Sequence, residues 1–185
     1  MKYKFVIPGQ PFGKQRPRKS FKLKGLYTPR ETTNYEAYVR NIANKQASMI
    51  DKPLRVDITA YFEIPKSFSK KRRQACLAGL EKPTKKPDKD NIEKVILDGM
   101  NPLFKTNKAT HKKEMVVPGF YQDDKQVIDG FTRKLYGSKA CVLVEVEEMA
   151  PKRPIKYQKG KWYYINEDGN LEPVWKEEND EDVNN

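Results

Sequence analysis

The chain has 185 residues, of which 37% are hydrophobic and 34% are charged, and its formal net charge at pH 7 is +12. This length predicts one domain with an additional tail, large enough to bury a hydrophobic core. No apolar run approaches the roughly 18 residues of a membrane-spanning helix, so we expect that the chain does not span a membrane. The N-terminus lacks the apolar segment of a signal peptide, and two cysteines cannot form a disulfide framework. These features predict a cytoplasmic protein with Cys76 and Cys141 reduced.

The positive charge is concentrated in residues 1–150, which hold 31 basic and 17 acidic side chains, whereas residues 151–185 hold six and eight. Such an excess favours a polyanionic partner, because binding releases the counterions condensed on the polyanion. Nucleic acid is the commonest candidate and anionic lipid is the next. Charge alone does not distinguish binding from catalysis.

In the first half of the chain we expect a strand, a basic loop, a helix and a second strand. The strand covers 2–8, and the Gly- and Pro-rich segment 9–19 forms the loop. The tetrad 33–36 matches a capping box, and apolar residues then recur at helical spacing to about Ile50. Apolar and polar residues alternate over 54–64, which is typical of a strand with one buried face.

The second half predicts two more helices and a long loop. A short basic helix is expected over 66–80. The tetrad Asp90-Asn91-Ile92-Glu93 forms a second capping box, and apolar residues behind it recur on one helical face as far as Leu103. Asp90 and Lys94 lie on the opposite face of this helix. The Lys-rich segment 104–121 is expected to be a loop.

The remaining elements are strands followed by an acidic end. Residues 126–136 and 140–147 predict two strands joined in hairpin style. The aromatic segments 161–165 and 171–175 flank a Gly-containing turn, which predicts a small appended hairpin. Residues 176–185 are acidic and nearly free of apolar side chains, which predicts disorder.

These elements predict an α/β fold. We expect a single compact domain over 1–150, in which a mixed sheet of about four strands packs against two main helices. Residues 151–175 form the appended hairpin segment, and 176–185 form the acidic tail. The polar face of the helix near Asp90 should point away from the sheet, where a nucleic-acid backbone could reach it.

Clustered carboxylates are unexpected in so basic a chain, yet they occur at Asp88 and Asp90 and again at Asp123 and Asp124. Because Asp88 and Asp90 are two residues apart before a helix, an extended approach places both side chains on one side of the chain. Mg²⁺ binds a few carboxylates together with waters and phosphate oxygens. A third carboxylate from the second pair could complete a site that activates water. Lys94, one helical turn after Asp90, could stabilise charge on the phosphate, so the group indicates a phosphodiesterase site.

A purely structural interpretation competes with this one. Asp90 could be only a helix N-cap, Asp88 a favourable charge at the helix start, and Lys94 with Asp98 a surface ion pair. The acidic pair 123–124 could belong to a turn. Spacing alone leaves the two interpretations evenly balanced.

The motifs resemble those of the RusA family of Holliday junction resolvases, which are endonucleases of bacterial and prophage genomes. Residues 88–94 match the family's D-x-D-N-[LI]-x-K, and 97–101 continue its helix. Residues 123–127 match its D-D-x-x-V, and the segment 9–18 is similar to its basic N-terminal G-x-P-x-x-K-x-R-P-R pattern. The resemblance covers about residues 2–148.

The resemblance implies that Asp88, Asp90 and Asp124 bind the catalytic metal ion and that Lys94 is the active-site lysine. It assigns Asp123 to the same metal site as a neighbouring support. It further implies a Mg²⁺-dependent homodimer that cuts two opposing strands of a four-way DNA junction in recombination and repair. A two-fold dimer suits that two-fold substrate.

Seven basic residues near these motifs are expected to contact DNA phosphates: Lys14, Arg16, Arg18, Lys85, Lys86, Lys89 and Lys125. The Lys-rich segment 104–121 and the segment after Pro151 depart from compact members of the family. The role of both is left open.

Two other functions compete. In the first, Pro87-Asp88 and Asp123-Asp124-Lys125 form the PD-(D/E)-x-K signature of restriction-type nucleases. This alternative makes Lys125 the essential lysine and leaves Asp90 and Lys94 unexplained. In the second, the chain binds nucleic acid without cutting it, and its binding is salt-sensitive but independent of Mg²⁺.

Overall fold

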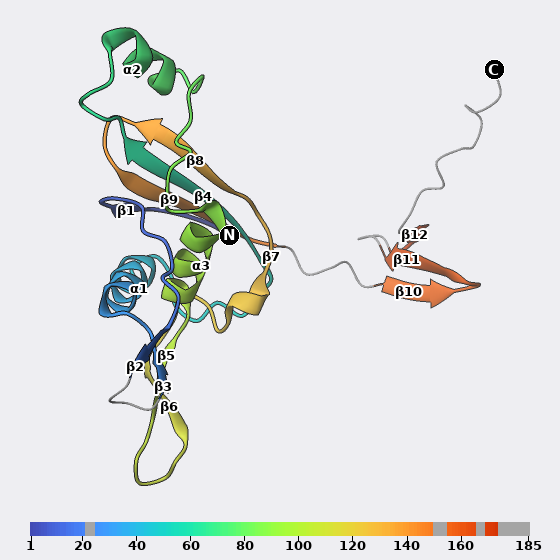
Figure 1. Cartoon of the computed structure of the whole chain (residues 1–185). Helices are drawn as coiled ribbons and strands as arrows, with labels where there is room; N and C mark the ends of the chain where they lie inside the picture. The colour runs from blue at the N-terminus through green and yellow to red at the C-terminus, as the bar shows by residue number, and fades with distance from the viewer. Residues whose placement is uncertain (21–24, 150–154, 166–168, 174–185) are drawn as a thin grey trace, which may run out of the picture. The chain divides into compact units, whose positions relative to one another are not determined.

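The computed structural model describes residues 1–20, 25–149, 155–165 and 169–173. The chain forms two compact units, Met1–Met149 and Ala150–Asn185, and each is described by itself (Figure 1). The first unit combines helices with a mixed sheet, which confirms the predicted α/β class. Among the described helices, none is long and apolar enough to cross a membrane.

A five-stranded mixed sheet forms the centre of the first unit. Its strands are β1 (Lys2–Pro8), β4 (Leu54–Glu63), β7 (Val127–Asp129), β8 (Thr132–Gly137) and β9 (Cys141–Glu148). β9 pairs antiparallel with both β1 and β4, and the other edge of β4 pairs in parallel with β7 and β8. Alternate side chains of β9 and of the first half of β4 are buried, so the period-two pattern predicts these two strands correctly.

The predicted hairpin of residues 126–136 and 140–147 is wrong. Although both strands are fully described, β8 and β9 do not pair with each other, because β4 lies between them. The connection from Gly137 to Cys141 therefore passes across β4. The first predicted strand is also divided, into the short 3-10 helix η1 (Asp124–Gln126), β7 and β8. A period-two pattern shows which side chains face the core, but it does not identify the neighbouring strand.

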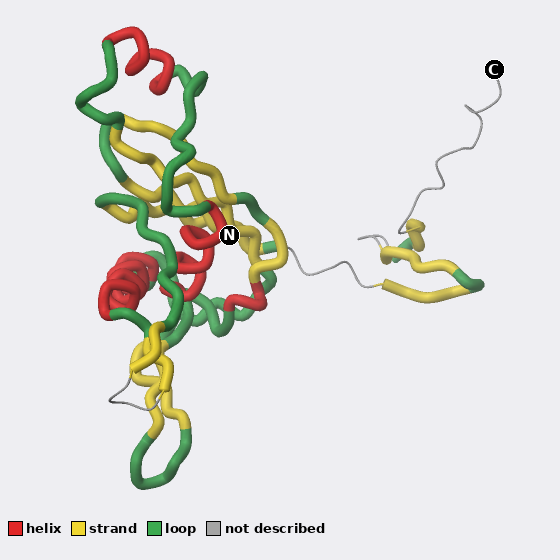
Figure 2. The backbone as a smooth tube through the Cα atoms, viewed as in Figure 1, coloured by secondary structure: helices red, strands yellow, loops and turns green. Residues whose placement is uncertain are grey.

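Two helices, α1 (Arg30–Ala43) and α3 (Lys89–Met100), pack against each other and share one hydrophobic core with the sheet (Figure 2). They cross closely because Gly99 of α3 has no side chain. A Cβ atom there would lie 2.7 Å from Cβ of Val39 in α1. The third helix, α2 (Lys70–Leu77), contacts β8 at one end of the sheet and is shorter than predicted.

Both main helices begin earlier than their predicted capping boxes. α1 starts after Pro29 and ends at Ala43, so the tetrad that begins at Thr33 lies one turn inside the helix. Proline fixes its own φ near a value that suits a helix start, and α1 has no side-chain cap. α3 starts after Asp88, whose side chain makes no capping hydrogen bond. The predicted capping role of Asp90 is therefore wrong, and the helix start does not use its carboxylate.

The predicted loop over 104–121 is also wrong, because an antiparallel hairpin of β5 (Leu103–Thr106) and β6 (Lys113–Val117) occupies this segment (Figure 2). Its side chains are almost all exposed, so the apolar alternation of a half-buried strand is missing. A second small antiparallel ribbon, β2 (Arg18–Ser20) and β3 (Gly25–Tyr27), follows the N-terminal loop.

The second unit contains a three-stranded antiparallel sheet of β10 (Ile155–Gln158), β11 (Lys161–Ile165) and β12 (Leu171–Pro173). The sequence predicts the pairing of β11 with β12 but not the additional strand β10. The expected acidic tail, residues 176–185, lies outside the described residues.

Gly99→Val should destabilise the first unit, because the new side chain would meet Val39 where α1 and α3 cross. Overpacking of this kind costs about 1–3 kcal/mol. Chemical denaturation of Gly99→Val, Val39→Ala and the double variant measures the effect. Since the smaller side chain makes room for the larger one, the double variant should lose less stability than the two single variants together. Wild-type stability of Gly99→Val would contradict the close crossing.

Candidate active site

Helix α3 orients the central part of the site. Ile92, Val95 and Ile96 are fully buried in the core, so the opposite face of the helix points away from the sheet. Asp90 and Lys94 lie on that face, and both are exposed. The apolar spacing of the sequence predicts this orientation, and the four-residue interval places the two side chains one helical turn apart.

A pocket of about 230 Å³ brings together residues from α3 and η1. Its lining consists of Asp90, Glu93, Lys94, Leu97, Asp98 and Asp124. Three residues that the motifs single out, Asp90, Lys94 and Asp124, therefore share one site, although Asp124 lies in a different part of the chain. Their arrangement combines acidic oxygens with one free ammonium group at the surface of the first unit.

Asp124 reaches the pocket because the residues around η1 are anchored to the segment before β4. The side-chain amide of Gln126 donates hydrogen bonds to the carbonyls of Ile50 and Lys52, each at 3.0 Å. The short helix is thus attached to the segment that precedes β4. Its position is determined by hydrogen bonds that no linear motif reveals.

Tyr121 connects the segment before η1 to α3. The residue is fully buried, and its hydroxyl donates a hydrogen bond to the carbonyl of Leu97 in α3 at 2.7 Å. Burial raises the pKa of Tyr121 far above its usual value, and the carboxylates of Asp124 and Asp98 raise this pKa further. The phenol therefore remains protonated and acts as a structural hydrogen-bond donor.

Asp123 is part of the backbone structure of η1. Its carboxylate accepts a hydrogen bond from the backbone N–H of Lys125 at 3.1 Å, and Gln126 completes a capping box. This hydrogen bond, together with attraction to the Lys125 ammonium, lowers the pKa of Asp123. The structural interpretation, in which the acidic pair 123–124 belongs to a turn, thus applies to Asp123. Its neighbour Asp124 lines the pocket.

Asp88 lines a neighbouring hollow instead of the pocket that contains Asp90. This hollow of about 590 Å³ lies between the N-terminal loop and the start of α3, and Lys14, Arg16 and Lys86 belong to its lining. The predicted pair of adjacent carboxylates is therefore divided between two recesses. Asp88 faces basic residues, and Asp90 faces acidic ones.

The N-terminal basic loop is attached directly to the start of α3. The backbone N–H of Lys14 donates a hydrogen bond to the carbonyl of Asn91 at 2.8 Å. Gly13 packs so closely that a Cβ atom there would lie 2.6 Å from Cβ of Pro87. The loop and the segment that carries Asp88 therefore form one local structure.

The side chain of Lys14 is held within the protein. Its ammonium group lies 2.6 Å from the carboxylate of Asp98 and also pairs with Glu36 of α1. Burial lowers the pKa of Lys14, but the hydrogen bonds to Asp98 and Glu36 outweigh burial, so this pKa is raised. Lys14 thus connects the basic loop to both main helices, and Asp98 pairs with it instead of forming the predicted surface pair with Lys94.

Lys134 of β8 holds the chain segment that precedes Asp88. Its ammonium group donates hydrogen bonds to the carbonyls of Lys85 and Pro87 at 2.6 and 2.9 Å. Because both acceptors belong to an irregular segment, this lysine supplies fixed contacts where secondary structure does not. Nothing in the sequence pattern distinguishes Lys134 from the other lysines of the chain.

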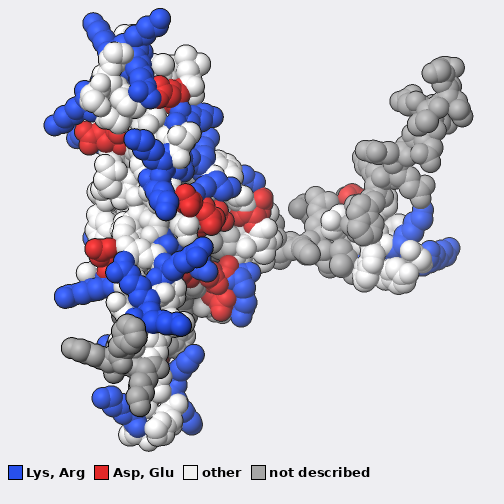
Figure 3. All heavy atoms as spheres, viewed as in Figure 1, with Lys and Arg blue, Asp and Glu red and all other residues white. Residues whose placement is uncertain are grey.

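The remaining basic residues predicted to contact DNA are exposed: Arg16, Arg18, Lys85, Lys86, Lys89 and Lys125. Figure 3 shows Lys and Arg side chains spread over this face from α2 to the hairpin β5–β6, with acidic side chains between them. Lys125 also lies 3.5 Å from the carboxylate of Asp123.

The pocket offers oxygen ligands that suit a hard divalent cation such as Mg²⁺. Asp90, Glu93 and Asp124 form no ion pair with any Lys or Arg in the described part of the chain. Within the same described residues, no three His, Cys, Asp or Glu side chains form a complete metal-binding group. Mg²⁺ does not need one, because it binds through one or two carboxylates and keeps waters and phosphate oxygens as its other ligands. The residues therefore fit a cation held jointly by protein and nucleic acid.

A sequence model of the endodeoxyribonuclease RusA family matches residues 8–147, which include α3, η1 and the hairpin between them. The chain belongs to the RusA endodeoxyribonuclease family. The uncharacterised protein YqaN of Bacillus subtilis (strain 168) is 30% identical to the chain over 153 residues, which represent 80% of this chain and 96% of YqaN. RusA membership confirms the resemblance carried by residues 88–94 and 123–127, and it identifies a family of DNA-cutting hydrolases that act on branched DNA.

Four residues that shape the RusA site lie outside the predicted set: Glu93, Asp98, Tyr121 and Lys134. Helical spacing could have identified Glu93, which lies near Asp90 on the polar side of α3. The other contacts join parts of the chain that are distant in sequence, and only the folded structure reveals them.

Lys134→Met should destabilise the segment before Asp88, because the carbonyls of Lys85 and Pro87 lose their charged donor. Hydrogen bonds to charged groups contribute about 1.5–3 kcal/mol, so we expect a loss within this range in chemical denaturation. Lys139→Met is the matched control, since Lys139 is exposed in the bend that follows the same strand. Equal stability of the two variants would contradict the anchoring role of Lys134.

Proposed function

We propose that this RusA-family protein is a Mg²⁺-dependent endonuclease that resolves four-way DNA junctions as a homodimer, with paired cuts in opposing strands. The observation that supports this most is the pocket shared by Asp90, Lys94 and Asp124. It combines the family's acidic motifs with a free lysine on the exposed face of α3. We further propose that the protein acts in the cytoplasm, in DNA recombination and repair.

In this proposal Asp90 and Asp124 are the principal metal ligands, and Glu93 lines the same pocket. A bound magnesium ion would supply an activated water and charge stabilisation at the scissile phosphate. Lys94 would place its ammonium group against the same phosphate and stabilise the negative charge that develops there. Asp88 lines the neighbouring hollow and would contribute its carboxylate to the metal site from there. Asp123 would support Asp124 through the cap of η1.

The DNA backbone would cross the exposed basic residues on either side of Asp88. Arg16 and Arg18 present forked donors that match phosphate geometry, and Lys85, Lys86 and Lys89 add charge beside the helix start. Lys14 has a different role in this proposal. Its ammonium is already paired with Asp98 and Glu36, so it would position the basic loop instead of binding phosphate.

The restriction-type alternative requires Lys125 as the essential lysine. Lys125 is directed toward Asp123, which caps η1, whereas Lys94 lines the pocket with Asp90 and Asp124. The arrangement therefore favours Lys94. A protein that only binds nucleic acid would leave the shared pocket without a chemical role.

Asp90→Asn should bind a labelled four-way junction but cut it at least about 100-fold more slowly, as expected when a metal site loses a ligand. The assay compares junction, linear duplex and single strand, each with Mg²⁺ or EDTA. Asp51→Asn, which alters an exposed carboxylate outside the pocket, is the control. Symmetric paired cuts confined to the junction would support the proposal. Wild-type cutting by Asp90→Asn would overturn the assigned role, and no cutting by the wild type would favour a binding protein.

Lys94→Met and Lys125→Met separate the two nuclease mechanisms. We expect Lys94→Met to lose about 100-fold or more in cleavage rate, since one donor to the developing charge is removed. Lys125→Met should retain most of the activity. Single-turnover cleavage with both variants at saturating DNA provides the comparison, and the opposite ranking would support the restriction-type site.

A further inference from the structure

The hairpin β5–β6 is inserted between the two elements that form the pocket. It follows the end of α3 and returns to the chain just before Tyr121 and η1. In Figure 1 it extends away from the sheet, at the end opposite α2. The hairpin is therefore continuous along the chain with both halves of the candidate active site.

The hairpin carries a concentrated positive charge that no ion pair neutralises in the described structure. Its exposed lysines are Lys105, Lys108, Lys112 and Lys113. Its one acidic residue, Glu114, accepts a hydrogen bond from the side chain of Asn107 at 2.8 Å. Four free ammonium groups on a projecting element are typical of a surface that binds a polyanion.

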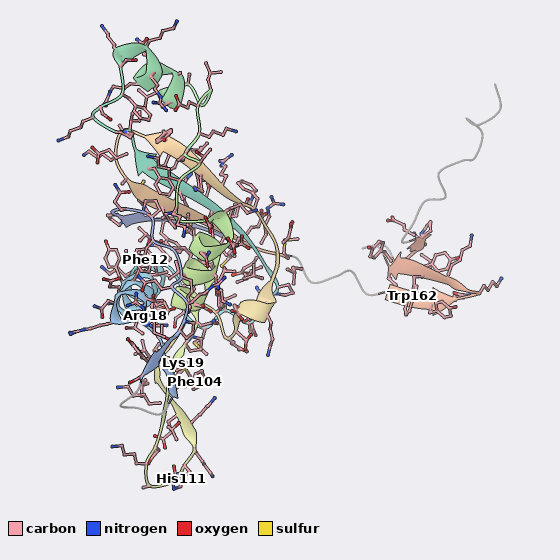
Figure 4. The ribbon with its side chains drawn as sticks, in the orientation of Figure 1. Phe12, Arg18, Lys19, Phe104, His111 and Trp162 are labelled. Atoms are coloured by element: carbon pink, nitrogen blue, oxygen red, sulfur yellow. The ribbon has the colours of Figure 1, made fainter. Side chains whose placement is uncertain are left out.

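The tip of the hairpin has a defined structure. The side-chain oxygen of Asn107 accepts a hydrogen bond from the backbone N–H of Ala109 at 2.9 Å, and its backbone carbonyl accepts one from His111 at 2.9 Å. The backbone N–H of Asn107 donates to the carbonyl of Lys112. Figure 4 places His111 at this tip and Phe104 near the base. The lysines are thus displayed on an ordered turn.

The base of the hairpin is equally well anchored. The backbone N–H of Phe120 donates to the carbonyl of Met100 at 2.8 Å. Arg40 of α1 donates to the carbonyl of Asn101 at 2.7 Å, and Asn44 donates to the carbonyl of Pro118 at 2.7 Å. These contacts prevent the hairpin from swinging freely about its connection to α3.

We propose that the hairpin β5–β6 is a DNA-binding arm that contacts backbone phosphates of a duplex arm of the junction, away from the phosphate that is cut. This proposal rests on the proposed function, because it assumes that the pocket around Asp90 engages branched DNA. The four residues of β5 span about 13 Å at about 3.3 Å per residue, and the turn 107–112 extends beyond them. The hairpin therefore reaches past about four base pairs, at about 3.4 Å each.

Charge favours DNA over a second copy of the chain as the occupant of this surface. Two such hairpins facing each other would bring together like charges. The exposed apolar residues Phe104 and Met115 lie opposite each other on β5 and β6, nearer the base of the hairpin. They are therefore not part of the charged tip. A phosphate backbone would neutralise the lysines without requiring an apolar contact surface.

The test compares wild type with Lys108→Gln/Lys112→Gln, using four-way junctions with long arms of about 20 base pairs or short arms of about four. Binding is measured in EDTA at several salt concentrations. Wild type should bind the long-armed junction more tightly, and the double variant should lose most of this preference. The logarithm of the binding constant falls linearly with the logarithm of the salt concentration, with a slope of roughly 0.9 per phosphate contact. The loss of two contacts should therefore reduce this slope by about two.

Lys70→Gln/Lys71→Gln is the matched control, because it removes the same charge from exposed positions on α2, at the other end of the sheet. Thermal unfolding verifies that all variants fold. An unchanged salt slope and arm-length preference in the hairpin variant would overturn the proposal, as would an equal effect of the control pair. A change in oligomeric state on sedimentation, caused by the hairpin substitutions alone, would assign the surface to a second copy.

These outcomes are separate from those that test the proposed function. Because binding is measured without metal, it does not depend on cleavage. Wild-type protein that shows the arm-length preference but never cuts would refute the catalytic proposal and leave the DNA-binding arm intact. Wild-type protein that cuts junctions with long and short arms equally well would refute the DNA-binding arm and leave the catalytic proposal intact.

Discussion

Burial of one face of α3 is the constraint on which the rest of the site depends. Ile92, Val95 and Ile96 lie in the core without exposure, and Gly99 allows α1 to cross closely behind them. A helix held in this way can present only its opposite face to solvent. Asp90 and Lys94 therefore lie on the exposed face of α3, and neither forms an ion pair within the described residues.

Around this helix the charged residues fall into two groups. One group is satisfied within the protein: Lys14 pairs with Asp98 and Glu36, and Asp123 caps η1. The other group, which includes Asp90, Lys94 and Asp124, lines an open pocket. Internal pairs contribute to the position of the loop and of η1, whereas unpaired groups retain the capacity to bind a cation and a phosphate. This division explains why acidic residues are clustered in a strongly basic chain.

The sequence predicts the parts of this arrangement that depend on local periodicity. The alternation over 54–64 predicts β4, and the helical spacing after Asp90 predicts which face of α3 is buried. It fails where contacts are long-range: β4 separates β8 from β9, and Lys134 anchors the segment before Asp88 from a distant strand. It also fails for the hairpin β5–β6, because a strand exposed on both faces has no apolar alternation. The capping boxes mark the wrong helix starts for a third reason, because Pro29 and Asp88 occupy the two N-cap positions and neither makes a side-chain capping hydrogen bond.

The position of the hairpin within the chain has a mechanical consequence. Its two ends continue directly into α3 and into the segment that carries Tyr121, and the carbonyls at its base are hydrogen-bonded to Arg40 and Asn44 of the α1 region. A polyanion bound to its lysines would therefore be held at a defined distance from Asp90 and Asp124. A flexible loop of the same composition would attract DNA equally well but would leave the scissile phosphate free to shift along the pocket. If the hairpin binds DNA as proposed, its ordered position between α3 and η1 would hold a DNA arm in a fixed relation to the carboxylates, and the insertion would then contribute to the choice of the phosphate that is cut.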